Sequence, residues 1–432
     1  MAKGAAVMLV ALVAAARTAE PRHIFFMRSP TSAPKQLPFM WLQQTPAGFS
    51  ADSFRETMSA LGMNQTRSRT GKYRVGLTFQ WEMLDCFLSP HSCNTSQTVA
   101  GIRTFLASAA ETGTPVQVTL DVVQFYYASG LWNWFDPTQP GFDLANVNNV
   151  EWTDWSPDNA TLIAWRNWGS QFRMPTPQPN LGSPKLLARL REVLAACVGA
   201  IREWYEAAKP HERELLVDVK IGEEVDVGAN FYYYPGGNEL WRASPHNSSA
   251  DPTYGPNWKK GLSGGLPALG YNMLRTLGIR SGGGPPTREE IAQGVRAYFA
   301  SCVSACVGAW PELARNGRLS AHAGAVGDPL LVPWDAPMVG PATAAYSFYI
   351  GPADTLGQPG LAKALRAHDP QSRRFAVAET FCFGCASRAE WRAYLEACFG
   401  SPYGNATYMR VYNVQPFLSS PGAVEALQDF VG

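Results

Sequence analysis

Three glutamates stand where short apolar segments of the chain end. Glu223 and Glu224 close ELLVDVKIGEE at residues 214–224, and Glu379 lies near the end of RRFAVAETF at residues 373–381. Two carboxyl groups across a cleft can share acid–base work: one protonates a leaving oxygen, and the other attacks a carbon atom or activates water. The alternatives are surface charge for Glu223 and Glu224, and a buried salt bridge for Glu379, for example with Lys220, because an unpaired buried glutamate is costly.

The two-residue period of a strand assigns residues 217–224 to two faces. One face carries Val217, Val219, Ile221 and Glu223, and the other carries Asp218, Lys220, Gly222 and Glu224. The apolar face should pack on helices and leave the charged face toward a central cleft. This favours Glu224 as the proton donor. Glu223 stays a candidate catalytic residue, turned away or supporting its neighbour.

Eight strand-like segments could position these residues. They span 38–44 (PFMWLQQ), 73–81, 115–125, 214–224, 318–324, 344–350, 373–381 and 408–417. Helical segments alternate with them, at 52–62, 98–112, 185–208, 291–310, 359–368, 391–400 and 422–430, and Thr287 with Glu290 and Ser387 with Glu390 match capping boxes. Eight alternating strands predict an α/β fold, a (β/α)8 TIM barrel. A doubly wound open sheet is the structural alternative.

Two insertions interrupt this alternation. Residues 126–183 follow the third strand and residues 225–285 follow the fourth, and both are far longer than the connections of about two to six residues usual in such folds. Barrel enzymes build their active sites at the carboxyl ends of the strands. The insertions are rich in Trp and Tyr, so we expect them to form the walls of a cleft within a single domain of residues 20–432.

Polar and aromatic residues near the strand ends and in the insertions are candidates for substrate binding. Amides and imidazoles suit hydroxyl recognition, and tryptophan suits stacking on a sugar face. Each of these residues is also compatible with a purely structural role. The candidates are Trp41, Gln44, Gln80, Trp81, Gln124, Trp132, Trp134, Tyr232, His322, Tyr412, Asn413 and Gln415.

The composition limits the class of partner. The net charge is +1 and 16% of the residues are charged, which gives no indication of nucleic acid or of an acidic membrane surface. Aromatic residues make up 12% of the chain, which mildly favours a carbohydrate ligand. The six histidines are scattered and show no zinc spacing, so neither a metal nor another cofactor is expected.

The first 19 residues predict a signal peptide. Lys3 precedes an apolar run from Ala5 to Ala15, which is too short for a comfortable membrane span, although an uncleaved anchor is an alternative. Five Asn-x-Ser/Thr sites agree with passage through a eukaryotic secretory pathway: Asn64, Asn94, Asn159, Asn247 and Asn405. We therefore expect a secreted or lumenal, N-glycosylated protein without a membrane span after cleavage.

Eight cysteines also fit an oxidising compartment. The short loop CFLSPHSC predicts a Cys86–Cys93 disulfide. Cys197, on the helix after strand three, should lie near Cys302 or Cys306, on the helix after strand four, and is expected to pair with one of them. Cys382 and Cys385 form a C-x-x-C pattern that lacks the thioredoxin-like context of an oxidoreductase.

By this strand count Glu224 ends strand four and Glu379 lies at the end of strand seven, and here the chain resembles the clan A glycoside hydrolases. In that clan the acid/base glutamate ends strand four and the nucleophile ends strand seven. The resemblance implies a retaining glycosidase that cleaves O-glycosidic bonds of oligosaccharides or polysaccharides. Clan members usually place an asparagine before the acid/base residue, where it helps to bind the sugar 2-hydroxyl; here Glu223 takes that place.

Two other functional classes remain in view. A secreted barrel that binds carbohydrate without catalysis would usually have lost one carboxylate of the pair, whereas both positions are filled here. A metal-dependent barrel hydrolase would need His-x-His or clustered His and Asp residues at strand ends, and His322 alone does not meet that requirement.

Overall fold

The computed structural model describes residues 22–27, 49–63, 73–84, 95–123, 131–139, 141–161, 164–167, 171–174, 177–223, 261–262, 266–267, 269–322, 336–348, 375–400, 406–411 and 414–432. In several strands the description covers the backbone alone, which includes residues 22–27 and 375–379.

Eight parallel strands form the central sheet of the described part. They are β1 (Arg22–Met27), β2 (Tyr73–Glu82), β3 (Val116–Asp121), β6 (Leu216–Ile221), β9 (Leu319–His322), β10 (Thr343–Phe348), β11 (Phe375–Thr380) and β12 (Ala406–Val411). Their order is β1-β12-β11-β10-β9-β6-β3-β2, and β1 pairs with both β12 and β2, so the pairing returns to its start. The prediction of a mixed α/β fold around a parallel sheet is confirmed.

Two of the expected strands require correction. The first strand of the sheet is β1 at Arg22–Met27, directly after the expected leader, rather than residues 38–44, which lie outside the described part. The apolar run RHIFFM therefore supplies the strand that we assigned to PFMWLQQ. The last strand ends at Val411, and Val414–Ser419 form the helix α12, so Gln415 lies on a helix and not on a strand.

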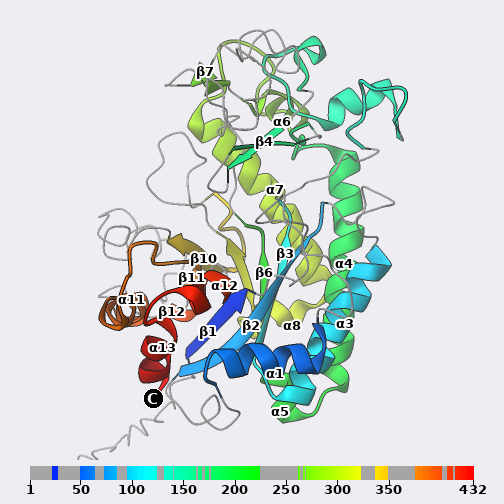
Figure 1. Ribbon diagram of the computed structural model, residues 1–432. Coiled ribbons are helices and arrows are strands. Elements are labelled where there is room, and N and C mark those ends of the chain that lie inside the picture. Colours follow the sequence, from blue (N-terminus) through cyan, green and yellow to red (C-terminus); the bar gives the residue numbers. More distant parts are fainter. Residues whose placement is uncertain are drawn as a thin grey trace, which may run out of the picture.

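Helices surround the strands (Figure 1). The longer ones are α1 (Ala51–Ala60), α3 (Thr95–Thr112), α4 (Pro184–Ala207), α7 (Arg288–Ala309), α11 (Arg388–Gly400) and α13 (Ala423–Val431). Short helices are α5 (Pro210–Arg213), α6 (Tyr271–Thr276) and α8 (Pro311–Arg315). The expected capping box opens α7, where Thr287 and Glu290 satisfy each other's backbone N–H groups. Ser183 caps α4 through the backbone N–H of Leu186 at 3.3 Å.

The main apolar core lies between the sheet and these helices. Phe79 and Trp81 of β2 both pack against Phe49, with ring centroids 4.5 and 5.7 Å apart, and Trp81 also packs against Phe105 of α3 at 5.3 Å. All four rings are buried. Phe79 and Trp81 therefore face the helices, and the alternate residues Thr78 and Gln80 face the other side of the sheet.

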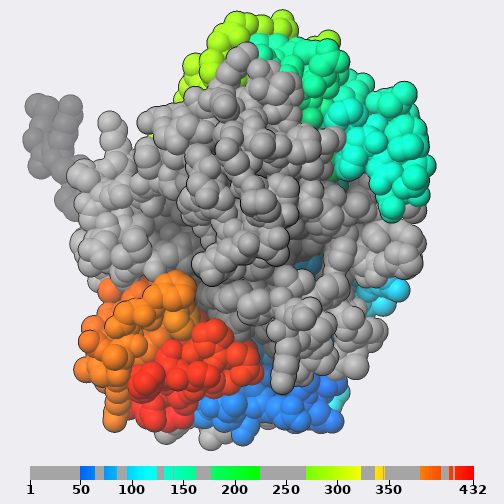
Figure 2. All heavy atoms as spheres, turned by 45° about the horizontal axis from the view of Figure 1, so that its top comes forward, coloured from blue at the N-terminus to red at the C-terminus, as the bar shows by residue number. Residues whose placement is uncertain are grey.

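The described parts of the two insertions pack against each other. The first contains the 3₁₀-helices η3 (Leu144–Asn149) and η4 (Pro157–Asn159) and the antiparallel strands β4 (Ala164–Asn167) and β5 (Gln171–Met174). The second contains β7 (Gly261–Leu262), β8 (Leu266–Pro267) and α6. Figure 1 places β4, β7 and α6 at one end of the molecule, and Figure 2 shows the described surfaces, teal and yellow-green, side by side.

Glu151 is the centre of this contact. Its buried carboxyl group comes from the first insertion and accepts hydrogen bonds from the backbone N–H groups of Gly270 at 2.9 Å, Asn272 at 3.3 Å and Met273 at 3.2 Å, at the start of α6. Gly270 has no side chain with which to cap the helix, so Glu151 serves as its cap from a distant part of the chain. Burial raises the pKa of Glu151 to about 8, although these hydrogen bonds oppose the shift.

The described cysteines differ from the expected pairing. Cys197, Cys302 and Cys306 are buried and no disulfide joins Cys197 to either of the others, so the predicted bond is wrong. Helices α4 and α7 do pack together, but the Cys197 Sγ lies 4.0 Å from the Met83 Sδ, a contact near the end of β2. Cys86 and Cys93 lie outside the described residues. Cys382 and Cys385 are joined by a disulfide.

Nowhere among the described residues does a helix combine the length and the apolarity that a membrane crossing requires.

Replacing Glu151 with alanine should leave three backbone N–H groups of the α6 start without their acceptor. We expect a loss of about 3 kcal/mol in the free energy of unfolding, because buried unsatisfied donors are expensive. Urea unfolding of Glu151→Ala beside the control Glu203→Ala, at an exposed position of α4, would measure it. Equal losses in the two variants would contradict the capping role.

Candidate active site

Most of the side chains that the structure describes inside the barrel are polar. Hydrogen bonds join strands that are not neighbours in the sheet, so these side chains meet across the interior rather than along one surface. The Ser320 hydroxyl of β9 lies 3.0 Å from that of Tyr408 on β12, and Arg410 of β12 donates to the Gln80 Oε1 of β2 at 3.1 Å. TIM barrels more often fill this space with branched apolar side chains. The buried inward residues are Thr78, Gln80, Gln117, Thr119, Asp121, Asp218, Lys220, Ser320, His322, Tyr408 and Arg410.

Glu223 lies at the centre of the charged part of this interior. Its Oε1 accepts a hydrogen bond from the Lys220 Nζ at 2.6 Å and another from the Arg410 guanidinium, and its Oε2 lies 3.0 Å from the His322 Nδ1. All four side chains are completely buried. Burial pushes the pKa of Glu223 upward, but the charges of Arg410 and Lys220 outweigh it and hold that pKa well below its usual range.

His322 is neutral around pH 7 in this environment. Burial and the adjacent Lys220 charge lower its pKa to about 4. The His322 Nδ1 lies 3.0 Å from the Lys220 Nζ and 3.0 Å from the Glu223 Oε2, so it contacts a cation and a carboxylate at once. Two buried cations, one carboxylate and one neutral imidazole make up this cluster, which joins β6, β9 and β12.

The inward direction of Glu223 corrects the face predicted from strict alternation. β6 ends at Ile221, and Gly222 has φ of 80°, a left-handed conformation that glycine adopts without strain. A Cβ atom on Gly222 would lie 2.8 Å from the Phe299 Cε1 and 2.9 Å from its Cζ. The alternation therefore breaks at Gly222. Glu223 joins the same side as Lys220 instead of following Val219 and Ile221 toward the helices.

A second set of contacts links the cluster to β2 and β3. The Gln80 Nε2 donates to the Asp121 Oδ2 at 2.8 Å, and the Gln80 Oε1 accepts from Arg410. The Asp121 Oδ1 accepts from the backbone N–H of Val123 at 2.8 Å, just beyond the end of β3. Gln80 thus connects an acidic residue on one strand with a basic residue on another, and both are fixed at the carboxyl ends of their strands.

Asp218 occupies the next level toward the amino ends of the strands. It accepts hydrogen bonds from the Ser320 hydroxyl at 2.5 Å and from the Gln117 Nε2 at 3.0 Å. Burial raises the pKa of Asp218 to about 6, and its hydrogen bonds oppose the shift. This network fills the barrel below the charged cluster and gives Lys220 a packed support.

The predicted binding residues separate into three groups. Gln80 and His322 lie in the buried interior described above. Trp81 and Trp132 are completely buried in apolar packing. Trp134 is half-buried and donates to the Thr161 carbonyl at 3.3 Å, and Gln415 is exposed on α12. Outside the described residues lie Glu224, Trp41, Gln44, Gln124, Tyr232, Tyr412 and Asn413, together with the side chain of Glu379.

Sequence reasoning missed Arg410, Asp121 and Gln117 as members of the site. The sequence suggests Lys220 only as a partner of Glu379, whereas Lys220 pairs with Glu223. A usable signal existed: charged or amide residues at every second position of otherwise apolar strands, as in VQVTLD of β3 and TYMRV of β12.

The chain also contains a Gly-x-Ser-x-Gly match, GLSGG at residues 261–265. Its first two residues form β7 of a small antiparallel pair with β8. A nucleophile elbow instead turns from a strand of the main sheet into a helix. Among the described residues, no group of three or more His, Cys, Asp or Glu side chains is arranged to hold a metal ion.

No protein-family model and no curated protein sequence matches the chain. Three similar solved structures are the exo-beta-1,4-mannosidase Op5Man5 from Opitutaceae bacterium strain TAV5, the catalytic domain of a beta-amylase from Paenibacillus polymyxa, and a 3-keto-D-glucoside 4-epimerase from E. coli. Their sequence identities are 13%, 10% and 10%, and their TM-scores are 0.42, 0.44 and 0.36.

The alignments cover 95%, 95% and 94% of this chain and 60%, 97% and 98% of those structures, so the chain spans three-fifths of the mannosidase structure. Two of the three are glycoside hydrolases by name. At these values the likeness carries no argument about what this chain does.

Gly222→Ala should be more destabilising than an alanine at another left-handed glycine. Gly278 has φ of 68° with open space around its Cβ direction, so Gly278→Ala reports the backbone strain alone, about 1 kcal/mol. The overlap with Phe299 should raise the loss for Gly222→Ala to about 3 kcal/mol in urea unfolding. Adding Phe299→Leu should recover part of it. Equal losses at the two glycines would argue against a close approach of Phe299.

The depressed pKa of His322 predicts a specific acid sensitivity. The unfolded chain takes up a proton at this residue near pH 6.5, whereas the folded protein does so only near pH 4, so this stabilisation is present above pH 6.5 and is lost as the pH falls toward 4. The difference in unfolding free energy between the wild type and His322→Asn should shrink by about 3 kcal/mol over that window. Urea unfolding at several pH values would test this, and parallel profiles would refute it.

Proposed function

We propose that the protein is a secreted glycoside hydrolase that cleaves O-glycosidic bonds of an oligosaccharide or polysaccharide with retention of configuration. In this proposal the closed sheet is a (β/α)8 TIM barrel, and insertions 126–183 and 225–285 fold over the carboxyl ends of its strands. The carrying observation is the buried cluster of Lys220, Glu223, His322 and Arg410 at that end. Strongly shifted pKa values at the carboxyl ends of barrel strands are typical of active sites.

The electrostatics of the cluster separate the two neighbouring glutamates. A general acid needs a carboxyl group that keeps its proton near the working pH. Glu223 is held ionised by two cations, so it is poorly suited to donate a proton. We therefore assign the acid/base role to Glu224, and we assign to Glu223 the role of a fixed anion that orients Lys220 and Arg410.

Glu379 is the proposed nucleophile. It precedes Thr380 in β11, and the Thr380 hydroxyl contacts the Tyr394 hydroxyl of α11, on the helix side of the sheet. The pairing of β11 with β10 passes from Ala378 directly to Thr380, so residue 379 lies at a β-bulge, a feature that is common next to active sites. β11 pairs directly with β12, which carries Arg410. The positive charge of Arg410 on the adjacent strand would favour the ionised carboxylate that nucleophilic attack requires.

A secreted carbohydrate-binding barrel without catalysis is the alternative function. It would use the same polar interior and the same insertions, and it would bind sugar without turnover. Assay of the secreted protein on a panel of chromogenic glycosides and polysaccharides separates the two, because the binding protein would retain the ligand and release no product.

Glu379→Gln should lower kcat by several orders of magnitude while the protein still folds and binds sugar, because the covalent intermediate can no longer form. Activity on the best substrate of the panel, with circular dichroism as the folding control, provides the measurement. Near-normal turnover by Glu379→Gln would overturn the assignment. In a retaining enzyme the carboxyl groups of Glu379 and Glu224 should lie about 5–5.5 Å apart.

Comparison of the neighbouring glutamates completes this test. Glu224→Gln should impair substrates with poor leaving groups far more than activated aryl glycosides, and azide should partly restore its activity. Glu223→Gln should instead lose about 3–5 kcal/mol of stability, because it removes a buried carboxylate that pairs with two buried cations. Azide rescue of Glu223→Gln, with none for Glu224→Gln, would exchange the two roles.

A further inference from the structure

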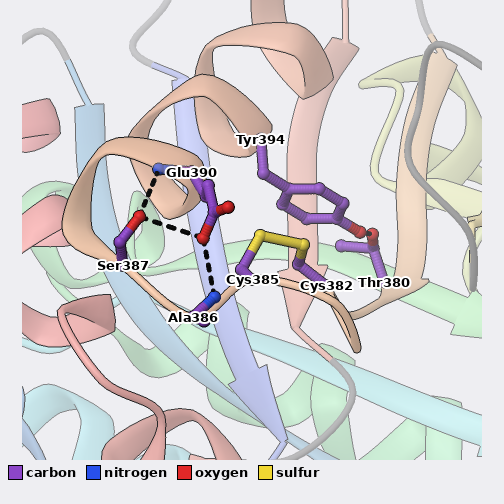
Figure 3. The surroundings of a disulfide bond; sticks show 7 residues. All are labelled: Thr380, Cys382, Cys385, Ala386, Ser387, Glu390 and Tyr394. Atoms are coloured by element: carbon purple, nitrogen blue, oxygen red, sulfur yellow. Dashed lines mark hydrogen bonds between the residues drawn. A yellow bond between two sulfur atoms is a disulfide. The ribbon is translucent and has the colours of Figure 1, made fainter.

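The turn between β11 and α11 contains a disulfide that the proposed chemistry does not use. Cys382 and Cys385 are bonded across the four-residue segment CFGC, and the Cys385 N–H lies 3.4 Å from the Cys382 carbonyl oxygen. Figure 3 shows the bond in the turn that leads from Thr380 into the first turn of α11. A disulfide this local removes little conformational freedom from the unfolded chain, so stabilisation of the fold explains little of its presence.

This disulfide differs from the other described cysteines in its exposure. The turn reaches solvent through Phe383, which is 67% exposed, and both bonded cysteines are themselves partly exposed. The remaining four described cysteines are buried thiols: Cys197, Cys302, Cys306 and Cys398. Burial raises the pKa of Cys306 to about 12 and the pKa of Cys302 well above its usual range, so those thiols are unreactive. Among the described cysteines, the Cys382–Cys385 pair is therefore the one that a reductant in solution can reach.

Both ends of the turn are attached to packed structure. On the strand side, the Thr380 hydroxyl contacts Tyr394 of α11, and the Phe381 ring lies 5.3 Å from that of Trp391. On the helix side, Glu390 accepts from the Ala386 N–H at 2.8 Å and from the Ser387 hydroxyl at 2.9 Å. The disulfide thus sets the short path between the last residues of β11 and the first turn of α11.

We propose that Cys382–Cys385 is a redox-active site that undergoes exchange with a dithiol reductant, and that its state controls the end of β11 and hence the hydrolase. The second part rests on the proposed function, because Glu379 lies three residues before Cys382. In the exchange, one thiolate of the reductant attacks a cysteine sulfur, the Sγ–Sγ bond breaks, and the other cysteine leaves as a thiolate that takes up a proton. The second reductant thiolate then resolves the mixed disulfide, so the reductant becomes a disulfide and both cysteines become thiols.

The first experiment tests whether Cys382–Cys385 is a redox site, and it does not depend on enzyme activity. The oxidised full-length protein is treated with a dithiothreitol series, alkylated with iodoacetamide and mapped by mass spectrometry. Cys382 and Cys385 should be alkylated at a reductant concentration at least about tenfold below that needed for any other disulfide of the chain. The four buried thiols should react only in denaturant. Resistance of Cys382 and Cys385 to alkylation until the protein unfolds would overturn the redox site.

The second experiment tests the coupling to the strand. Reduced and alkylated protein, and the double variant Cys382→Ser/Cys385→Ser, should each lose at least about tenfold in kcat while circular dichroism stays unchanged, and removal of reductant before alkylation should restore the wild type. Cys306→Ala is the matched control, since it removes a cysteine far from this turn, and its activity should respond to reductant as the wild type does. Selective alkylation with unchanged kcat would overturn the coupling. A protein without any glycosidase activity would refute the proposed function, while the alkylation pattern would still decide the redox site.

Discussion

The contact between Glu223 and its two cations is the constraint on which the rest of the barrel interior depends. Lys220 and Arg410 come from strands on opposite sides of the barrel, and both side chains are completely buried. The Glu223 carboxylate between them compensates these charges. Glu223 is delivered to that position by a glycine with left-handed backbone geometry, so a single backbone angle decides whether two buried positive charges are compensated.

This cluster also explains the unusual content of the barrel. Once charges lie on the axis, every neighbour must offer a donor or an acceptor, and the requirement spreads from strand to strand. Gln80 bonds to both Arg410 and Asp121. At the next level, Asp218 accepts hydrogen bonds from Gln117 and Ser320. A hydrogen-bonded interior has few alternative arrangements, which favours a rigid platform at the carboxyl ends of the strands. Such rigidity suits a site in which charges must be ready before a ligand arrives.

Much of the framework could be predicted from the sequence, and the limits of that prediction have physical causes. Apolar periodicity predicts seven of the eight strands and the long helices α4 and α7. The spacing of Thr287 and Glu290 predicts the capping box that opens α7. The strand at Arg22–Met27 was missed because it directly follows the apolar leader. Alternation placed Asp218 and Lys220 correctly but failed at Gly222, since a positive φ leaves no mark in a hydrophobic pattern. Cross-barrel partners such as Arg410 and Glu223 are 187 residues apart, and one sequence does not report that distance.

The cap that Glu151 provides for α6 has a consequence for how the chain acquires its structure during synthesis. Gly270, whose N–H group donates a hydrogen bond to the Glu151 carboxyl group, lies 119 residues after Glu151 in the chain. At ribosomal rates of about 5–20 residues per second, Gly270 is synthesised roughly 6–24 s after Glu151. During that interval the carboxyl group of Glu151 and the neighbouring side chain of Trp152 remain in water, although the folded protein buries both completely. The nascent chain therefore exposes this surface to water until the second insertion has been synthesised.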